Sequence, residues 1–276
     1  GKRHGCTTVS LHGSGEATLH PEMPRFVGMV KDLGMQCIAV TNGYHLDEKL
    51  SRALIEAGID VIRVSGIGYD RDTYRQWMKT DAFDRVRDNT RLFRRLNEDM
   101  GAASVIRLYH LVLDPSQMER EIELYRRNWI DYCGVEAEIW TMHNWAGTYD
   151  GIPAPRHAAR RRTCGRPHAP YLNVRAGGIA GRSAAVVPCC FVLGRDEQAV
   201  LGHLDAQSIE EVLSSPAYEE LRRKHDAGDF DSIPYCKDCD QLYDLPESLV
   251  WTNIPGKAYG QSKVLQDLDY RRWTGG

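Results

Sequence analysis

The 276-residue sequence has no apolar run near the roughly 18 residues that span a bilayer, so we expect no membrane partner. Neither sign of charge dominates, since 35 Lys and Arg face 38 Asp and Glu and the formal net charge is −3. Such a balance gives no general attraction to nucleic acid, and we expect none as a partner. A signal-peptide pattern is also missing. The eight cysteines, spread along a long chain, therefore predict a cytoplasmic protein with reduced thiols and not a secreted disulfide scaffold.

The first 150 residues alternate between strand-like and helix-like segments. Short apolar runs, typical of strands, cover 7–12, 36–41, 60–65, 104–113 and 136–142. Helical patterns lie between them at 21–33, 47–57, 81–100 and 115–132, and a glycine that favours helix termination follows each one. This alternation predicts an α/β domain over 1–150, with parallel strands and right-handed crossovers.

A different organisation is expected after residue 150. Residues 146–162 are rich in Gly, Pro and Arg and predict a linker. Five arginines within 156–166 favour a solvated segment, with contact to an acidic substrate or leader peptide as the alternative. Short strand-like pieces at 171–174 and 184–187 precede a helix at 208–225, which opens on the capping box of Ser208 and Glu211 and is expected to break near Pro216. We assign 151–245 to a second, cysteine-rich domain and 246–276 to a C-terminal tail.

The most specific local signal is the C-x-x-C pair of Cys236 and Cys239. Two thiolates at this spacing can hold one metal centre, although a redox dithiol shares it. Cys164 and the adjacent Cys189 and Cys190 lie in the same region. We predict metal ligation by Cys164, Cys189, Cys236 and Cys239, with Cys190 as the alternative to Cys189, because two adjacent cysteines do not easily ligate one centre. Zinc and an iron–sulfur cluster both suit four thiolates, and buried core cysteines are the remaining alternative.

Small and polar residues follow the predicted strands. In a β/α barrel the functional residues lie where strands end, and small residues there let a ligand approach the backbone. Glu16 could accept a hydrogen bond from an ammonium group, whereas an inward-facing Arg107 would need an anionic partner. Eight residues form the candidate cofactor-binding set: Gly13, Ser14, Gly15, Glu16, Thr41, Asn42, Ser65 and Arg107. No catalytic residue is assigned.

The order of these motifs resembles that of radical S-adenosylmethionine (radical SAM) enzymes with a C-terminal SPASM or twitch auxiliary-cluster domain. The loop at 13–16 is similar to the GGE motif of the family, 41–43 matches its TNG motif, and 144–147 resembles its NWGG-type strand end. The order of cysteines from Cys164 to Cys239 looks like the auxiliary domain. The resemblance implies a partial (β/α)6 TIM-like barrel, with five strands present and the first missing, followed by a small α+β domain.

The resemblance also implies cofactors and chemistry. S-adenosylmethionine and one auxiliary [4Fe–4S] cluster would bind, and a 5′-deoxyadenosyl radical would abstract hydrogen from a peptide or a small polyol-type substrate. A reducing partner such as a flavodoxin or ferredoxin would supply electrons. By the same resemblance, Glu16 and its glycines hold the methionine amino group, Ser65 contacts the carboxylate or ribose, and Arg107 contacts a carboxylate.

Two departures from the family pattern shape the expectation. The CxxxCxxC motif that should follow the first strand is absent, and the first strand here carries the GGE-like loop of a second strand. We therefore expect an N-terminally truncated fragment that cannot itself start the radical reaction, with a second [4Fe–4S] cluster only in the full-length protein; loss of the motif by degeneration is the alternative. No cysteine follows Cys239, so one auxiliary cluster is expected.

Two other functions stay open. One is a non-catalytic, zinc-stabilised β/α binding protein, because four thiolates suit zinc and iron alike. The other is an ordinary β/α-barrel hydrolase or aldolase. That class should show a catalytic lysine or paired carboxylates at strand ends, and the sequence shows neither.

Overall fold

The computed structural model describes residues 1–151, 161–169, 171–179, 181–192, 197–243, 248–257 and 259–261. The chain forms two compact units, one of Gly1–Thr141 with Leu249–Tyr259 and one of Met142–Ser248 with Gly260–Gly276. Most of the predicted linker, 152–160, and most of the predicted tail lie outside the described residues. The domain boundaries expected from the sequence, after residues 150 and 245, stay predictions.

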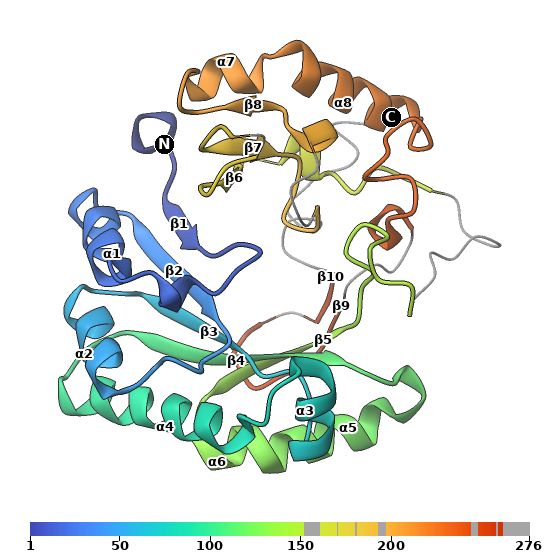
Figure 1. Ribbon diagram of the computed structural model, residues 1–276. Coiled ribbons are helices and arrows are strands. Elements are labelled where there is room, and N and C mark those ends of the chain that lie inside the picture. Colours follow the sequence, from blue (N-terminus) through green and yellow to red (C-terminus); the bar gives the residue numbers. More distant parts are fainter. Residues whose placement is uncertain are drawn as a thin grey trace. The chain divides into compact units, whose positions relative to one another are not determined.

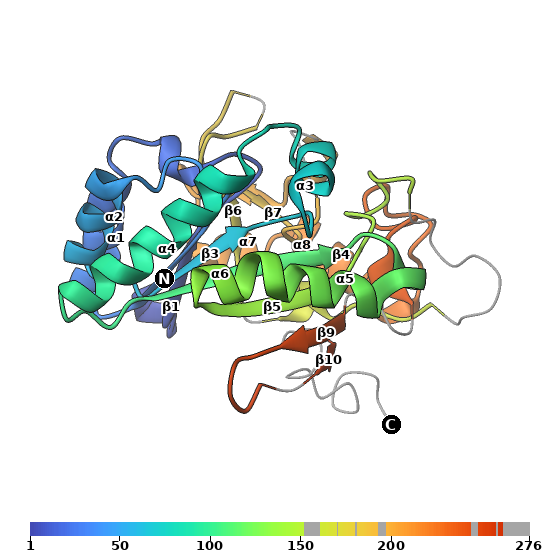
Figure 2. The same ribbon diagram turned by 90° about the horizontal axis from the view of Figure 1, so that it is seen from below.

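The first unit contains a sheet of parallel strands (Figure 1). Its order is β1 (Thr8–Leu11), β2 (Gln36–Thr41), β3 (Val61–Ser65), β4 (Val105–Val112) and β5 (Glu136–Thr141). Each strand pairs in parallel with the next, which confirms the five predicted strands and their direction. The sheet also contains β9 (Ser248–Thr252), which pairs antiparallel with β5 (Figure 2) and was not predicted.

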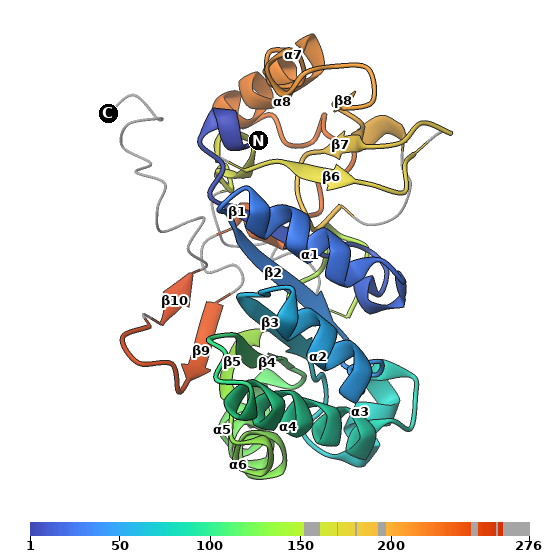
Figure 3. The same cartoon turned by 90° about the vertical axis from the view of Figure 1, so that its left-hand side faces the viewer.

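Helices α1, α2 and α4 lie along the same face of this sheet (Figure 3). The crossovers contain α1 (Met23–Asp32), α2 (Glu48–Glu56), α3 (Arg71–Met78), α4 (Phe83–Asp99), and a run of α5 (Met118–Tyr125), the π-helical η4 (Arg126–Ile130) and α6 (Asp131–Cys133). Shorter 3-10 turns are η1 (Lys2–His4), η2 (Ala17–Leu19) and η3 (Pro115–Gln117). The sequence analysis did not predict α3, although Tyr74, Trp77 and Met78 lie on one face of it and Asp70 and Thr73 form a capping box at its start.

Alternate strand residues face the helices and form the core of the first unit. Ile62, Val64 and Leu108 are each 1% exposed or less and pack with helix side chains. Cys37 and Cys133 are buried in this core, as predicted, and burial raises the pKa of both thiols, that of Cys37 to about 11. Cys6 packs against the core from a half-buried position. These three cysteines therefore have a packing role.

The second unit is α+β. Its antiparallel sheet has β6 (Asn173–Arg175), β7 (Ala185–Val187) and β8 (Gly202–His203), and it packs against α7 (Ile209–Leu213) and α8 (Pro216–Ala227). The capping box of Ser208 and Glu211 is present, and the helix breaks before Pro216, both as predicted. Shorter elements are η5 (Arg166–His168), η6 (Glu197–Ala199), η7 (Asp240–Leu242) and β10 (Gly260–Gln261). Within the described ranges, no helix has the length and apolarity to cross a bilayer.

Trp129 lies at the centre of an aromatic cluster in the first unit, and its removal should destabilise that unit. The side chain is fully buried, its Nε1 donates to the Gly68 carbonyl at 2.8 Å, and its ring lies 5.1 Å from that of Phe83. Trp129→Ala should lower the free energy of unfolding by about 3–5 kcal/mol, because it leaves a cavity. Urea unfolding followed by circular dichroism measures this. Leu33→Ala, at a position 54% exposed, is the control and should change it by less than about 0.5 kcal/mol; equal losses would contradict the prediction.

Candidate functional site

Glu16 ties the loop after β1 to the end of β2. Its Oε1 accepts hydrogen bonds from Thr18 N at 3.0 Å, Thr18 Oγ1 at 2.6 Å and Thr41 Oγ1 at 2.6 Å. Its Oε2 accepts from Asn42 N at 2.6 Å. Three residues of the candidate cofactor set, Glu16, Thr41 and Asn42, are thus brought together. Because Oε2 has a single donor among the described residues, it can accept a further one from a ligand.

The glycines near these strand ends differ in whether packing requires a glycine at that position. A Cβ at Gly43 would lie 2.9 Å from side-chain atoms of Val64 and Val86, so packing alone demands glycine there. A Cβ at Gly15 would meet nothing within 4 Å, and the backbone there is not left-handed. The loop of Gly13, Ser14 and Gly15 is exposed. Packing within this unit gives no reason for glycine at 15, whereas close approach of a ligand to the backbone would give one.

Ser65 ends β3 in a half-buried position. Its hydroxyl has no hydrogen-bond partner among the described residues, so it is available to a ligand. Asn42 is engaged differently, because its Oδ1 accepts from Tyr44 N at 2.9 Å and shapes the turn after β2. The side chain of Asn42 therefore holds the loop, while that of Ser65 does not.

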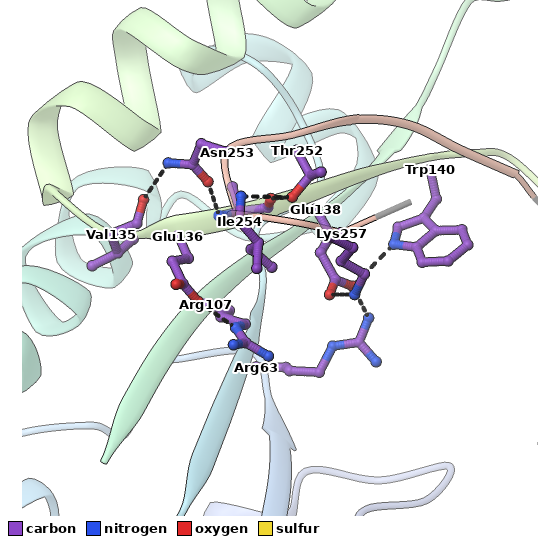
Figure 4. Close-up of polar contacts among 11 residues, drawn as sticks. Arg63, Arg107, Val135, Glu136, Glu138, Trp140, Thr252, Asn253, Ile254 and Lys257 are labelled. Atoms are coloured by element: carbon purple, nitrogen blue, oxygen red, sulfur yellow. Dashed lines mark hydrogen bonds and ion pairs between the residues drawn. The ribbon is translucent and has the colours of Figure 1, made fainter. Parts of the chain in front are cut away.

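Arg107 has an anionic partner within the protein. Its Nε donates to Glu136 Oε2 at 2.6 Å, across the β4–β5 pair (Figure 4). Strand alternation places both residues on the face opposite the helices, because the neighbouring Leu108 and Ala137 belong to the core. A carboxylate ligand would therefore have to share Arg107 with Glu136.

Glu138 forms a second ion-pair group on the same face (Figure 4). Its Oε2 accepts from Arg63 Nη2 at 3.0 Å and from Trp140 Nε1 at 3.1 Å, and Lys257 pairs with its Oε1. Burial raises the pKa of Glu138, but Arg63 and Lys257 outweigh it and hold that pKa below its ordinary value of 4.5. Sequence analysis missed this group, because Lys257 lies more than a hundred residues from Glu138.

The lowered pKa of Glu138 predicts an acid-sensitive contribution to stability. Its pairing stabilises the fold above the unfolded-state pKa, and this contribution is lost as pH falls through the folded-state pKa. Glu138→Gln should lower the free energy of unfolding at neutral pH by about 1.5–3 kcal/mol, and the difference from the parent should vanish in acid below 4.5. Urea unfolding over a pH series measures both. Glu48→Gln, in an exposed pair with Arg52, is the control; a pH-independent difference would contradict this assignment.

The second unit gathers several of its cysteines, of which Cys164 and Cys239 are buried and Cys189 and Cys236 half-buried. Cys164 and Cys239 are 8% and 7% exposed and share an apolar cluster, against which Cys236 packs. Burial raises the pKa of Cys236, and the nearby Cys164, Cys189 and Cys239 raise it further. Cys190 is exposed and is not among the thiols that act on Cys236. At Cys164, however, burial raises the pKa and Cys190 is the neighbouring thiol that raises it further. The ligand set, and the choice between Cys189 and Cys190, therefore stay predictions.

Backbone N–H groups point at three of these sulfurs. Burial raises the pKa of each thiol, and hydrogen bonds from backbone N–H groups oppose that effect. Arg166 donates to Cys164, Phe191 and Val192 donate to Cys189, and Gln241 donates to Cys239. Such donors stabilise thiolates, the form in which cysteine binds metal. The residues present therefore fit an iron–sulfur cluster.

Within the described residues, no group of three His, Cys, Asp or Glu side chains is preformed to hold a single metal ion. Four thiolates suit zinc and an iron–sulfur cluster alike.

Asn144 fixes the loop that carries Cys239. Its backbone N donates to Asp240 Oδ2 at 2.7 Å, and its Nδ2 donates to the Asp238 carbonyl at 2.8 Å. The following Trp145, Ala146 and Gly147 all have positive φ, at 44°, 58° and 84°. A Cβ at Gly147 would lie 2.8 Å from Asp238 Cβ, so glycine is required for the approach. The sequence marked residues 144–147 as a strand end, but not as the support of a cysteine loop.

Arg166 departs from the prediction. The arginine-rich segment 156–166 was expected to be solvated, and 156–160 lie outside the described residues. Arg166 itself is only 5% exposed, which contradicts a solvated position for this residue. Its guanidinium carbon lies 4.4 Å from the centre of the Phe191 ring, and that contact keeps it inside the unit. Periodicity could not reveal this, because the partner lies in a distant loop.

Comparison with protein families assigns both units. Residues 1–128 match the Radical SAM superfamily, and residues 182–240 match the SPASM model, described as an iron–sulfur cluster-binding domain. Among curated proteins, a probable GTP 3′,8-cyclase of Saccharolobus solfataricus is 35% identical over 85 residues, 31% of this chain and 27% of that protein. An uncharacterized protein of Methanocaldococcus jannaschii is 30% identical over 93 residues, 33% of this chain and 32% of that protein. The chain thus matches about a quarter to a third of the length of these relatives.

Solved structures share the fold. BtrN, in complex with AdoMet and 2-DOIA, has a TM-score of 0.52 and 19% identity, covering 88% of this chain and 79% of that one. Streptococcus suis SuiB, bound to S-adenosylmethionine, has a TM-score of 0.53 and 14% identity, covering 84% and 60%.

A parallel β/α unit joined to a cysteine-rich α+β unit defines an iron–sulfur protein of the partial-barrel class. Residues 1–128 of the chain are a radical SAM domain match, and residues 182–240 match the SPASM iron–sulfur cluster-binding domain. S-adenosylmethionine and [4Fe–4S] clusters are the cofactors of this class, and the partial TIM-like barrel predicted from the sequence is confirmed.

Proposed function

We propose that this chain is the barrel and auxiliary-cluster part of a radical SAM oxidoreductase that modifies a peptide or a small polyol-type metabolite. The observation that carries the proposal is the cysteine cluster of the second unit, where Cys164 and Cys239 are buried together and Cys236 packs against them. Cys164, Cys189, Cys236 and Cys239 would hold one auxiliary [4Fe–4S] cluster. The match to an iron–sulfur cluster-binding domain over 182–240 supports this choice of metal.

The barrel residues would bind S-adenosylmethionine at the strand ends. Oε2 of Glu16 would accept a hydrogen bond from the methionine amino group. The exposed backbone of residues 13–15 would let the cofactor approach closely. The hydroxyl of Ser65 would donate to the carboxylate or ribose. Thr41 and Asn42 would position Glu16, since both donate to its carboxylate. When bound, the cofactor and its cluster supply hydrogen abstraction by a radical route, and the protein orients the substrate and excludes water.

Two arguments bear on the substrate and the partners. SuiB shares the fold and has been solved with its precursor peptide SuiA, at a TM-score of 0.52, which supports a peptide substrate; BtrN with 2-DOIA supports a smaller one. Arg107 would contact a substrate or cofactor carboxylate only by competing with Glu136. A reducing partner such as a flavodoxin or ferredoxin in the cytoplasm would supply electrons, since thiolate-bound iron needs a reducing compartment.

These 276 residues would hold the auxiliary cluster without cleaving S-adenosylmethionine, because the sequence contains no CxxxCxxC motif. Cleavage by this exact chain would contradict that proposal.

Iron content tests the auxiliary cluster and the choice between adjacent cysteines. Anaerobically purified protein should contain about four irons per chain. Cys239→Ser and Cys189→Ser should each lose most of the iron, because each removes a ligand. Cys190→Ser should keep it, since Cys190 is exposed. One zinc per chain, or loss of iron in the Cys190 variant with retention in the Cys189 variant, would contradict the assignment.

Binding of S-adenosylmethionine tests Glu16. In equilibrium dialysis, Glu16→Ala should weaken binding at least tenfold, or about 1.4 kcal/mol, because the acceptor of the amino group and the anchor of both strand-end loops are lost. Glu22→Ala removes an exposed carboxylate six residues away and serves as the control. Equal affinities in the two variants would exclude Glu16 from the site.

A further inference from the structure

Three of the four candidate ligand cysteines share one local arrangement. Two positions after each of them stands a residue of one contact group: Arg166 after Cys164, Phe191 after Cys189 and Gln241 after Cys239. A contact among these three residues therefore reaches the loops of three candidate ligands.

The side chain of Arg166 contacts the other two residues of this set. Its guanidinium carbon lies 4.4 Å from the centre of the Phe191 ring, and its Nη2 donates to Gln241 Oε1 at 3.3 Å. Arg166 is 5% exposed and Gln241 is 2% exposed, so these contacts lie in the interior of the second unit. One side chain thus joins the loops of Cys164, Cys189 and Cys239.

The charge of this side chain matters as much as its contacts. A guanidinium stays protonated in proteins, so Arg166 places a permanent positive charge inside the unit. Arg166 stands two positions after Cys164 and contacts the residues two positions after Cys189 and Cys239, so this charge lies next to the loops of the candidate ligands. Four thiolates around a cluster bring excess negative charge, and burying that charge is costly unless a cation compensates it.

We propose that Arg166 is a positioning residue of the auxiliary cluster, which joins the three ligand loops and raises the reduction potential of the cluster through its buried charge. This inference rests on the proposed cluster. One-electron reduction adds one negative charge to the cluster, and a nearby cation stabilises the reduced form more than the oxidised form. The potential should therefore fall when the charge is removed. The auxiliary cluster would then accept an electron more readily than its four thiolates alone would allow.

The test is a redox titration of anaerobically purified protein, with dithionite as the reductant and electron paramagnetic resonance as the readout. Arg166→Gln keeps an amide donor for Gln241 but removes the charge. We expect it to lower the equilibrium constant for reduction about tenfold, a shift of about −59 mV for a one-electron couple. Arg166→Lys keeps the charge and should shift the potential by less than half as much. Arg182→Gln, in an exposed pair with Asp205 of the same unit, is the control and should leave the potential unchanged.

The outcomes separate this inference from the proposed function. Wild-type protein without iron would refute the cluster itself. Wild-type protein with iron, together with an Arg166→Gln variant at the wild-type potential, would refute only the role of Arg166. A lysine variant that shifts as far as the glutamine variant would exclude charge as the cause. If the Arg166→Gln variant loses its iron, the Arg166→Lys variant decides between the outcomes. A lysine variant that keeps its iron and has a potential near that of the wild type supports the proposal. A lysine variant without iron overturns the role of the charge.

Discussion

Parallel pairing of five consecutive strands is the constraint on which the first unit depends. A parallel pair cannot be closed by a hairpin, so each strand is followed by a crossover that returns the chain to the same end of the sheet. The carboxyl ends of β1, β2 and β3 consequently meet at one edge. Glu16, Thr41 and Asn42, up to 26 positions apart, become hydrogen-bonded neighbours there. The candidate cofactor site follows from the topology.

The same constraint explains the face of the sheet opposite α1, α2 and α4. Crossovers that cover one side of the sheet leave alternate residues of the strands on the other side, where polar side chains can stand if they find partners. The partners here are charged residues of other strands, since Arg63 pairs with Glu138 and Arg107 pairs with Glu136. Lys257, from the segment after β9, completes the group at Glu138. The polar face is thus held by ion pairs, and any carboxylate that binds there competes with the protein's own glutamates.

The second unit gathers four thiols, which repel one another once they are ionised. Burial and mutual repulsion raise the pKa values of the thiols, so the apo pocket favours protonated sulfur. Backbone donors and the Arg166 charge act in the opposite direction at Cys164 and Cys189. A pocket with these opposing influences is suited to a cluster that binds thiolates, and its stability in the absence of metal comes from the apolar side chains around it.

The sequence by itself determined the elements and much of the candidate site. Apolar periodicity gave the five strands, the capping box of Ser208 and Glu211 gave the start of α7, and cysteine spacing gave the candidate ligands, because these signals are local. The short helix α3 was missed although its capping box of Asp70 and Thr73 is a local signal, whereas β9 could not be predicted because its pairing partner lies over a hundred residues away. Only the tertiary structure decided that Arg107 pairs with Glu136, that Asn144 holds the Cys239 loop, and that Arg166 is buried. Each of these depends on which distant segments meet, and that is set by packing and not by the residues next to them in the chain.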